Sequence, residues 1–208
     1  MTGTEEKKTQ PEAQGQAGSA HETRGLTFDA LRVRAQQLSL REQLESQHFL
    51  LERLNAASAR LLQAIELGDV YDAIGEIIGN LIGSEEVAIF QHHSAKQTLS
   101  LVWSTGIEKE TLHQLGLGAG LIGRATHEGT SQFRDRRRSP ALLPHESKLT
   151  ACIPLKLDRE VIGVIAILGL LPQKNGLEWA DFELLKYFET YGAVAAQHQN
   201  LQKNSVNP

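Results

Sequence analysis

The chain has 208 residues, of which 40% are hydrophobic and 22% are charged, a composition typical of a globular protein. Its length suits one ordinary domain with attached segments and excludes a large multidomain enzyme. Lys and Arg total 21 against 25 Asp and Glu, so the formal net charge of -4 argues against a general phosphate-backbone binder. The single cysteine, Cys152, can form neither an intramolecular disulfide nor a multi-thiolate metal site by itself, which favours a reducing, cytoplasmic setting.

The first 25 residues contain no apolar run that would serve as a signal-peptide core or a membrane anchor. Between Thr2 and Gly25 the only apolar side chains are alanines, and Gln, Glu, Gly, Thr and Ser dominate. Such a segment buries too little surface to offset the entropy of ordering. We therefore expect residues 1–25 to be a disordered tail and residues 204–208 a short disordered end.

Residues 26–67 contain neither Pro nor Gly, and helix-forming residues surround an apolar seam with heptad spacing. About 40 residues in one helix exceed the diameter of a small domain, so we predict a coiled coil that dimerises the protein. A core helix lying along one domain is the alternative, and the orientation of the paired helices stays open. The predicted dimer contacts are Val33, Leu40, Leu44, Leu51, Leu54, Leu61 and Ile65 of this helix, with Leu185 and Tyr191 near the C-terminus.

The remaining segment, 68–203, mixes helical and alternating patterns, with turn residues between them. In chain order we predict a helix over 70–82, strands over 86–92 and 98–104, a helix over 108–115, a glycine-rich turn into a helix that ends near 129, a short strand over 131–134, a basic loop over 135–147, strands over 149–157 and 161–170, and a helix over 178–202. The sequence therefore predicts an α+β fold. An antiparallel sheet carries the N- and C-terminal helices on one face and short helices plus the loop on the other.

The order of these elements, together with three short motifs, resembles the GAF domain family of small-molecule sensory and dimerisation modules. The motifs are Gly-Ala-Gly-Leu-Ile-Gly-Arg-Ala over 118–125 with Glu-Gly-Thr over 128–130, the hairpin Ala-Cys-Ile-Pro-Leu over 151–155 with Val-Ile-Gly-Val-Ile over 161–165, and Asp-Phe-Glu-Leu-Leu over 181–185. The resemblance implies a small-molecule pocket between the sheet and the segments that cover it. It does not specify the ligand, because one fold hosts unrelated effectors.

An arginine cluster, Arg-Asp-Arg-Arg-Arg over 134–138, leads into the loop expected to cover that pocket. Adjacent arginines on a net acidic chain form a local anion site by charge alone. The sequence favours a solvated basic loop, and the alternative hypothesis is that Arg134 or Arg136 meets a small anionic effector, or the loop an acidic protein partner. Asp135 is expected to order the loop through backbone amides. The other candidate ligand-binding residues are Trp103, Ile122, Arg124, Phe133, His145 and Cys152.

Other chemistries find less support in the sequence. The run 118–123 matches the dinucleotide fingerprint G-x-G-x-x-G, but a predicted helix, and not a strand, precedes it. Three histidines, His113, His127 and His145, would have to converge to hold iron or haem, as some GAF-like sensors imply, and surface or capping roles are the simpler interpretation. Among GAF relatives, those that bind a bilin attach it through a cysteine, and those that reduce methionine sulfoxide rely on several cysteines. Cys152 is the only cysteine in this chain, so the resemblance does not favour the reductase activity.

The sequence thus favours a non-enzymatic cytoplasmic regulator, a GAF-type homodimer that senses a small-molecule effector and relays its binding to a regulatory or effector protein in trans. Two alternatives stay open. One is a ligand-free adaptor whose pocket is filled by Trp103, Phe133 and Ile122, and the other is a haem or iron sensor acting through histidine. We expect no direct contact with nucleic acid and no membrane insertion, and the sequence identifies no cofactor.

Overall fold

The computed structural model describes residues 17–107, 112, 114–117, 120–134 and 142–206. The chain divides into two compact units, residues 1–47 and 48–208. Helix α1, Ala17–Leu67, ends where the sequence predicts but begins inside the segment expected to be a disordered tail. Residues 1–16 of that tail lie outside the described residues, and helix α5, Ala193–Val206, extends into the predicted disordered end.

The second unit is built on a six-stranded antiparallel sheet whose strand order is β3-β2-β1-β6-β5-β4. The strands are β1 (Val87–His93), β2 (Thr98–Thr105), β3 (Gln114–Gly116), β4 (Gln132–Phe133), β5 (Ala151–Leu157) and β6 (Glu160–Ile167). The central strands β1, β5 and β6 are the most deeply buried, as their near-continuous apolar runs predict. The predicted α+β class, with its antiparallel sheet, is confirmed.

One predicted element is corrected. The sequence favours a helix over 108–115, but residues 114–116 form the edge strand β3, which pairs with Thr98, Leu99 and Ser100 of β2. Pairing with the edge of β2 provides hydrogen-bond partners for the backbone N–H and C=O groups of this segment. The spacing of apolar residues along the sequence does not reveal such a tertiary partner. Residues 108–111 and 113, which made up most of the predicted helix, lie outside the described residues.

Helices cover one face of the sheet. They are the C-terminal part of α1, α2 (Val70–Ile77), the π-helical turn η1 (Ile78–Ile82), α4 (Trp179–Tyr187), the π-helical turn η4 (Phe188–Gly192) and α5. Their buried side chains, among them Ile74, Ile78 and Phe188, form one core cluster with Ile153 and Ile165 of the sheet. This layer contains both ends of the domain, so a change at one helix is transmitted to its neighbours by direct packing.

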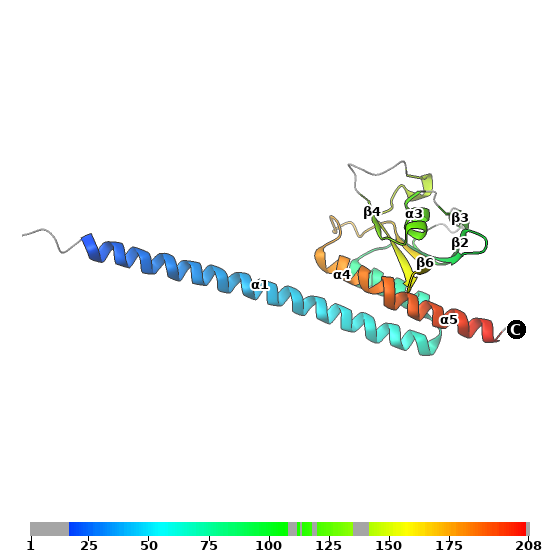
Figure 1. The fold of residues 1–208 in the computed structure, drawn as a ribbon, viewed down its shortest axis with the longest axis horizontal. Coiled ribbons are helices and arrows are strands. Elements are labelled where there is room, and N and C mark those ends of the chain that lie inside the picture. Colours follow the sequence, from blue (N-terminus) through cyan, green and yellow to red (C-terminus); the bar gives the residue numbers. More distant parts are fainter. Residues whose placement is uncertain (1–16, 108–111, 113, 118–119, 135–141, 207–208) are drawn as a thin grey trace, which may run out of the picture. The chain divides into compact units, whose positions relative to one another are not determined.

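Helix α3, Gly120–Glu128, covers the opposite face, as Figure 1 shows by its place across the sheet from α4 and α5. A second apolar cluster lies beneath it, and Phe90, Leu149 and Cys152 are at most 1% exposed. The buried carboxylate of Glu146, in the 3₁₀ turn η3 (Pro144–Glu146), accepts the backbone N–H of Ile122 at 2.9 Å. Gly120 has φ +66°, and a Cβ there would overlap that carboxylate, so the start of α3 requires glycine.

The inner end of the predicted dimer seam belongs to the domain core instead. Leu61 of α1 is 4% exposed, and Leu54 and Ile65 pack against the same cluster, as does the buried Leu185 of α4. Leu61 and Leu185 are covered by the domain itself, whereas Leu54 and Ile65 are only partly buried and keep some surface exposed. Among the described residues, no helix is both long and apolar enough to cross a membrane.

Candidate functional site

A cavity of about 510 Å³ opens where β4, the start of β5 and the β6–α4 connection come together. Its lining includes three cationic side chains, Arg134, Lys148 and Lys174, and no Asp or Glu among the described residues that line it. Apolar side chains such as Leu149 and Leu177 make up much of the rest. A concave surface with several cations and an apolar wall is suited to a small organic anion.

Arg134 is the cation that the backbone positions most firmly. Its N–H donates to the carbonyl of Thr150 at 2.9 Å, and its guanidinium donates to the carbonyl of Ser147 at 2.6 Å. The side chain is exposed, and within the described residues no carboxylate pairs with it. A guanidinium has five N–H donors, so donors remain for a ligand.

Lys148 also lines the cavity and makes an ion pair. Its ammonium is 2.5 Å from the carboxylate of Glu86, and the side chains of Lys148 and Glu86 are 67% and 22% exposed. A ligand must therefore compete with the Glu86 carboxylate for this ammonium.

Two aromatic rings form the rim of the cavity. Phe133 of β4 and Phe182 of α4 meet edge to face, with ring centroids 5.0 Å apart. They remain 42% and 40% exposed, which is unusual for side chains of this size next to a domain core. Together with the cations, they favour a ligand that carries both a negative group and an apolar or planar part.

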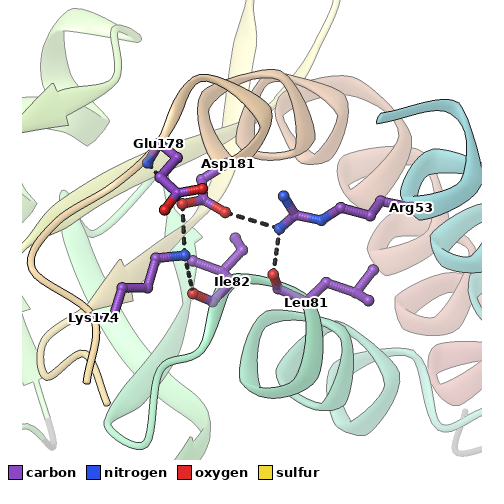
Figure 2. A network of polar contacts seen from close by, with 6 residues as sticks. All are labelled: Arg53, Leu81, Ile82, Lys174, Glu178 and Asp181. Atoms are coloured by element: carbon purple, nitrogen blue, oxygen red, sulfur yellow. Dashed lines mark hydrogen bonds and ion pairs between the residues drawn. The ribbon is translucent and has the colours of Figure 1, made fainter. Parts of the chain in front are cut away.

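Behind the cavity lies a buried polar network that joins α1 to α4 and to η1, drawn in Figure 2. Arg53 of α1 donates from Nη2 to Oδ1 of Asp181 at 2.8 Å and also to the carbonyl of Leu81. Lys174 approaches Oδ2 of the same carboxylate at 2.6 Å and donates to the carbonyl of Ile82. Arg53 and Asp181 are only 7% and 1% exposed, so this network is part of the core.

Asp181 is ionised in the folded domain. Burial alone would raise the pKa of its carboxyl, but the backbone N–H of Glu178 and the cations of Lys174 and Arg53 outweigh burial and lower the pKa. The Glu178 N–H donates to Oδ2 at 2.8 Å, an arrangement that also caps the start of α4. The carboxylate of Asp181 therefore binds two cations, Arg53 of α1 and Lys174 of the connection before α4.

The structure brings together two of the residues that the sequence singled out for ligand binding, Phe133 and Arg134. Asp135 and Arg136, two further predicted site residues, lie outside the described residues. Ile122 of α3 and Cys152 of β5 are fully buried in the cluster between α3 and the sheet, while Arg124 is partly exposed on α3 and lies 3.8 Å from Glu128. No role in the cavity or the network was predicted for Lys148, Lys174, Phe182, Asp181 or Arg53, although Asp181 and Phe182 belong to the motif over 181–185.

Trp103 lies on the other face of the sheet and does not share a pocket with Ile122. Its indole N–H donates to Oδ1 of Asp72 in α2 at 2.7 Å, and its ring fills the space above Gly75. The predicted joint filling of one pocket by Trp103, Phe133 and Ile122 is therefore wrong in its geometry, because the three side chains lie in separate places.

The contact of Trp103 with α2 gives a stability prediction. A Cβ at Gly75 would lie 1.9 Å from Cη2 of Trp103, so Gly75→Ala must displace the ring and its bond to Asp72. We expect a loss of about 1–3 kcal/mol in the free energy of unfolding, measured in urea. Gly79→Ala is the control, since a Cβ there meets its nearest atom at 3.6 Å. Equal stability of the two variants would contradict this account.

The histidines and the cysteine do not form a metal or redox centre among the described residues. No group of three or more His, Cys, Asp or Glu side chains suited to a metal is found there. His127 is exposed, His145 is half-buried, and His113 lies outside the described residues. Burial, together with the charge of Glu146, raises the pKa of the Cys152 thiol well above its ordinary value, which suppresses the reactive thiolate.

Solved structures with the same fold identify the class of domain. A GAF domain of a phosphoenolpyruvate-protein phosphotransferase from Acinetobacter superposes with a TM-score of 0.59 and 18% identity, over 74% of this chain and 98% of that one. The corresponding domain from Coxiella burnetii gives a TM-score of 0.63 and 15% identity, over 74% and 96%. A type II free methionine-R-sulfoxide reductase from Thermoplasma acidophilum gives 0.51 and 18%, over 63% and 93%.

The second unit of this chain is therefore a GAF-like domain, as the sequence motifs predicted. No protein-family model matches the chain. No curated protein matches it either.

Proposed function

We propose that this protein is a non-enzymatic cytoplasmic regulator whose GAF-like domain binds a small organic anion and passes the binding event to a partner protein. The observation that carries this proposal is the cavity lined by Arg134, Lys148 and Lys174, with no carboxylate among its described lining residues. Lys174 also contacts Asp181, which Arg53 of α1 binds, so the cavity and the network that reaches the N-terminal helix share a side chain.

The anion is expected to carry an apolar or planar group. The rings of Phe133 and Phe182 stand at the rim with about two fifths of their surface exposed, and a ligand that covers them would gain hydrophobic free energy. Phenyl phosphate is a suitable probe because it joins a doubly charged group to a single ring. Inorganic phosphate serves as the comparison without the ring.

The test measures phenyl phosphate affinity by isothermal calorimetry at low salt. We expect Arg134→Ala to weaken binding by about 10- to 100-fold, since a hydrogen bond to a charged group contributes about 1.5–3 kcal/mol. Arg124→Ala is the matched control because it removes an exposed arginine that pairs with Glu128 on α3 and does not line the cavity. Equal affinities for wild type and Arg134→Ala would overturn the assignment of this cavity.

Dimerisation through α1 is the second part of the proposal. Val33, Leu40, Leu44 and Leu51 occupy heptad positions of α1 and are 52–64% exposed. Four leucine or valine side chains in heptad register, all exposed in one copy, are typical of a seam that a second copy covers. Tyr191, also predicted as a dimer contact, is 58% exposed at the end of η4. Its ring stacks on Tyr187 at 4.6 Å, within the same chain.

A ligand-free adaptor remains the second candidate, and one observation favours it. The space beneath α3 is filled by the chain's own side chains, including Phe90, Ile122 and Leu149, which are at most 1% exposed. An adaptor would show no thermal stabilisation by phenyl phosphate at any concentration, whereas a ligand that binds only the native state raises the melting temperature.

A further inference from the structure

We propose that Lys174 reports the occupancy of the cavity to α1, because a bound anion competes with Asp181 for its ammonium group. This inference rests on the proposed function, since it requires an anion in the cavity. It adds the route by which the site would act on the N-terminal helix. The route consists of three side chains, Lys174, Asp181 and Arg53.

Lys174 belongs both to the cavity and to the buried polar network. It lines the cavity, and its ammonium forms the 2.6 Å ion pair with Asp181 and the hydrogen bond to the Ile82 carbonyl. The side chain is 17% exposed, compared with 1% for Asp181, so the lysine is the member of the pair with access to the cavity. A lysine ammonium on a four-carbon stem can exchange one anionic partner for another without movement of the backbone.

The backbone around Lys174 is held in place, which confines the change to the side chain. The Lys174 N–H donates to the Leu171 carbonyl at 2.9 Å, and the Leu171 N–H donates to the Gly83 carbonyl at 2.9 Å. These two bonds fasten the connection before α4 to the end of η1. An incoming anion would therefore redirect the ammonium and leave the connection where it is.

The charge balance of the network favours an added anion. Arg53 and Lys174 bring two positive charges to the single carboxylate of Asp181, and all three side chains are mostly buried. On the cavity side Arg134 adds a positive charge that has no carboxylate partner among the described residues, whereas the charge of Lys148 is paired with Glu86. In surroundings of low dielectric, an excess of buried cations strengthens the attraction for a negative ligand.

Redirection of Lys174 changes what holds α1. Once the ammonium turns to the ligand, Arg53 becomes the one side-chain cation on Asp181 in this network, and the Ile82 carbonyl loses its donor. Nη2 of Arg53 donates both to Asp181 and to the Leu81 carbonyl. Because Asp181 has then lost its other cation, the hydrogen bond of Arg53 to the carboxylate strengthens at the expense of the one to Leu81. The contact that joins α1 to η1 and α4 is thereby made dependent on the ligand (Figure 2).

Thermodynamic reciprocity supplies a sharp test, because a change at α1 must alter affinity at the cavity if the two are coupled. Arg53 does not line the cavity. Its removal leaves Asp181 to hold Lys174 alone, so the ligand must compete against a tighter pair. We expect Arg53→Met to weaken phenyl phosphate binding by about five- to tenfold, within the usual range of coupling between sites.

Two further variants show whether the effect runs through Lys174. In the Lys174→Met background, the added Arg53→Met substitution is expected to change affinity less than twofold, because the shared ammonium is gone. Arg60→Met in the wild-type background is the control, as Arg60 is another arginine of α1 whose ion pairs are with Asp69 and Glu76. We expect it to leave the affinity unchanged.

The possible failures are distinct. If wild type binds no phenyl phosphate at 10 mM, roughly the weakest affinity of interest, the proposed function fails and the coupling fails with it. If wild type and the Arg53→Met variant bind equally, the coupling alone is overturned. Should Arg53→Met not fold, Arg53→Gln also removes the charge but keeps an amide N–H donor for the same acceptors, and its affinity decides the question in the same way.

Discussion

Asp181→Asn is expected to destabilise the GAF-like domain by about 3–5 kcal/mol, because it leaves two mostly buried cations without their shared counter-charge. Arg53 and Lys174 come from segments far apart in the chain, so the loss falls on contacts that hold α1, η1 and α4 together. The measurement is urea unfolding followed by circular dichroism.

Asp158→Asn is the matched control for this substitution. Asp158 is exposed in the turn between β5 and β6 and has φ +53°, a conformation that asparagine also adopts. Its replacement is expected to change the free energy of unfolding by less than about 0.5 kcal/mol. A loss below about 1 kcal/mol for Asp181→Asn would mean that the carboxylate does not hold the network together.

The same carboxylate sets the acid stability of the domain. Its pKa is lower in the folded chain than the ordinary value of 3.8, so the unfolded chain binds the proton more tightly. The stability that Asp181 contributes is therefore complete above pH 3.8 and is lost as the pH falls through the lowered folded value. In unfolding measured against pH, the difference between wild type and Asp181→Asn should shrink below that point and stay constant near neutrality.

Replacing both Leu44 and Leu51 by Glu is expected to raise the dimer dissociation constant by at least about 1000-fold. Each leucine buried in a coiled-coil seam contributes about 1.5–3 kcal/mol, each substitution acts in both copies, and the introduced carboxylates repel one another. Both side chains are more than 60% exposed in one copy, so the substitutions should leave the fold of the single chain intact. Analytical ultracentrifugation at micromolar concentration measures the effect.

Leu38 and Leu67 provide the control for the dimer experiment. They are 53% and 66% exposed on α1, and neither occupies an a or d position of the heptad frame. Their joint replacement by Glu removes a similar exposed apolar surface without touching the seam. A wild-type monomer, or equal weakening by the two pairs of substitutions, would contradict the coiled coil.

Most of the sheet could be predicted from the sequence because its strands are long and their pattern is unambiguous. Trp103 shows where such reasoning fails. Strict alternation places it on the same face as Leu99 and Leu101, but the register of β2 against β1 shifts between Ile89 and Phe90. That bulge turns Trp103 to the helical face, and nothing in the local sequence signals it.

Only part of the candidate site could be predicted from the sequence, because the rest of it also depends on tertiary structure. Phe133 precedes the arginine cluster and Arg134 begins it, whereas Lys148, Lys174 and Phe182 come from two separate connections and helix α4, which meet only in the fold. Weak signals for the network did exist. Asp181 follows Glu178 at the spacing of a helix cap, and Arg53 interrupts the buried stripe that continues through Ala57, Leu61 and Ala64. A charge on a buried stripe requires a partner, but its identity is a property of the tertiary structure.

The carboxylate of Glu146 at the start of α3 also has a consequence for ligand selection. It accepts the N–H groups of Ile122 and Leu143, so the place where a helix end would attract a negative group is taken by the chain itself. A tethered group acts at an effective concentration that a dissolved metabolite must exceed to displace it. Dissolved anions therefore meet a resident competitor at this helix end, and under the proposed function their selection falls to the cationic cavity beside β4.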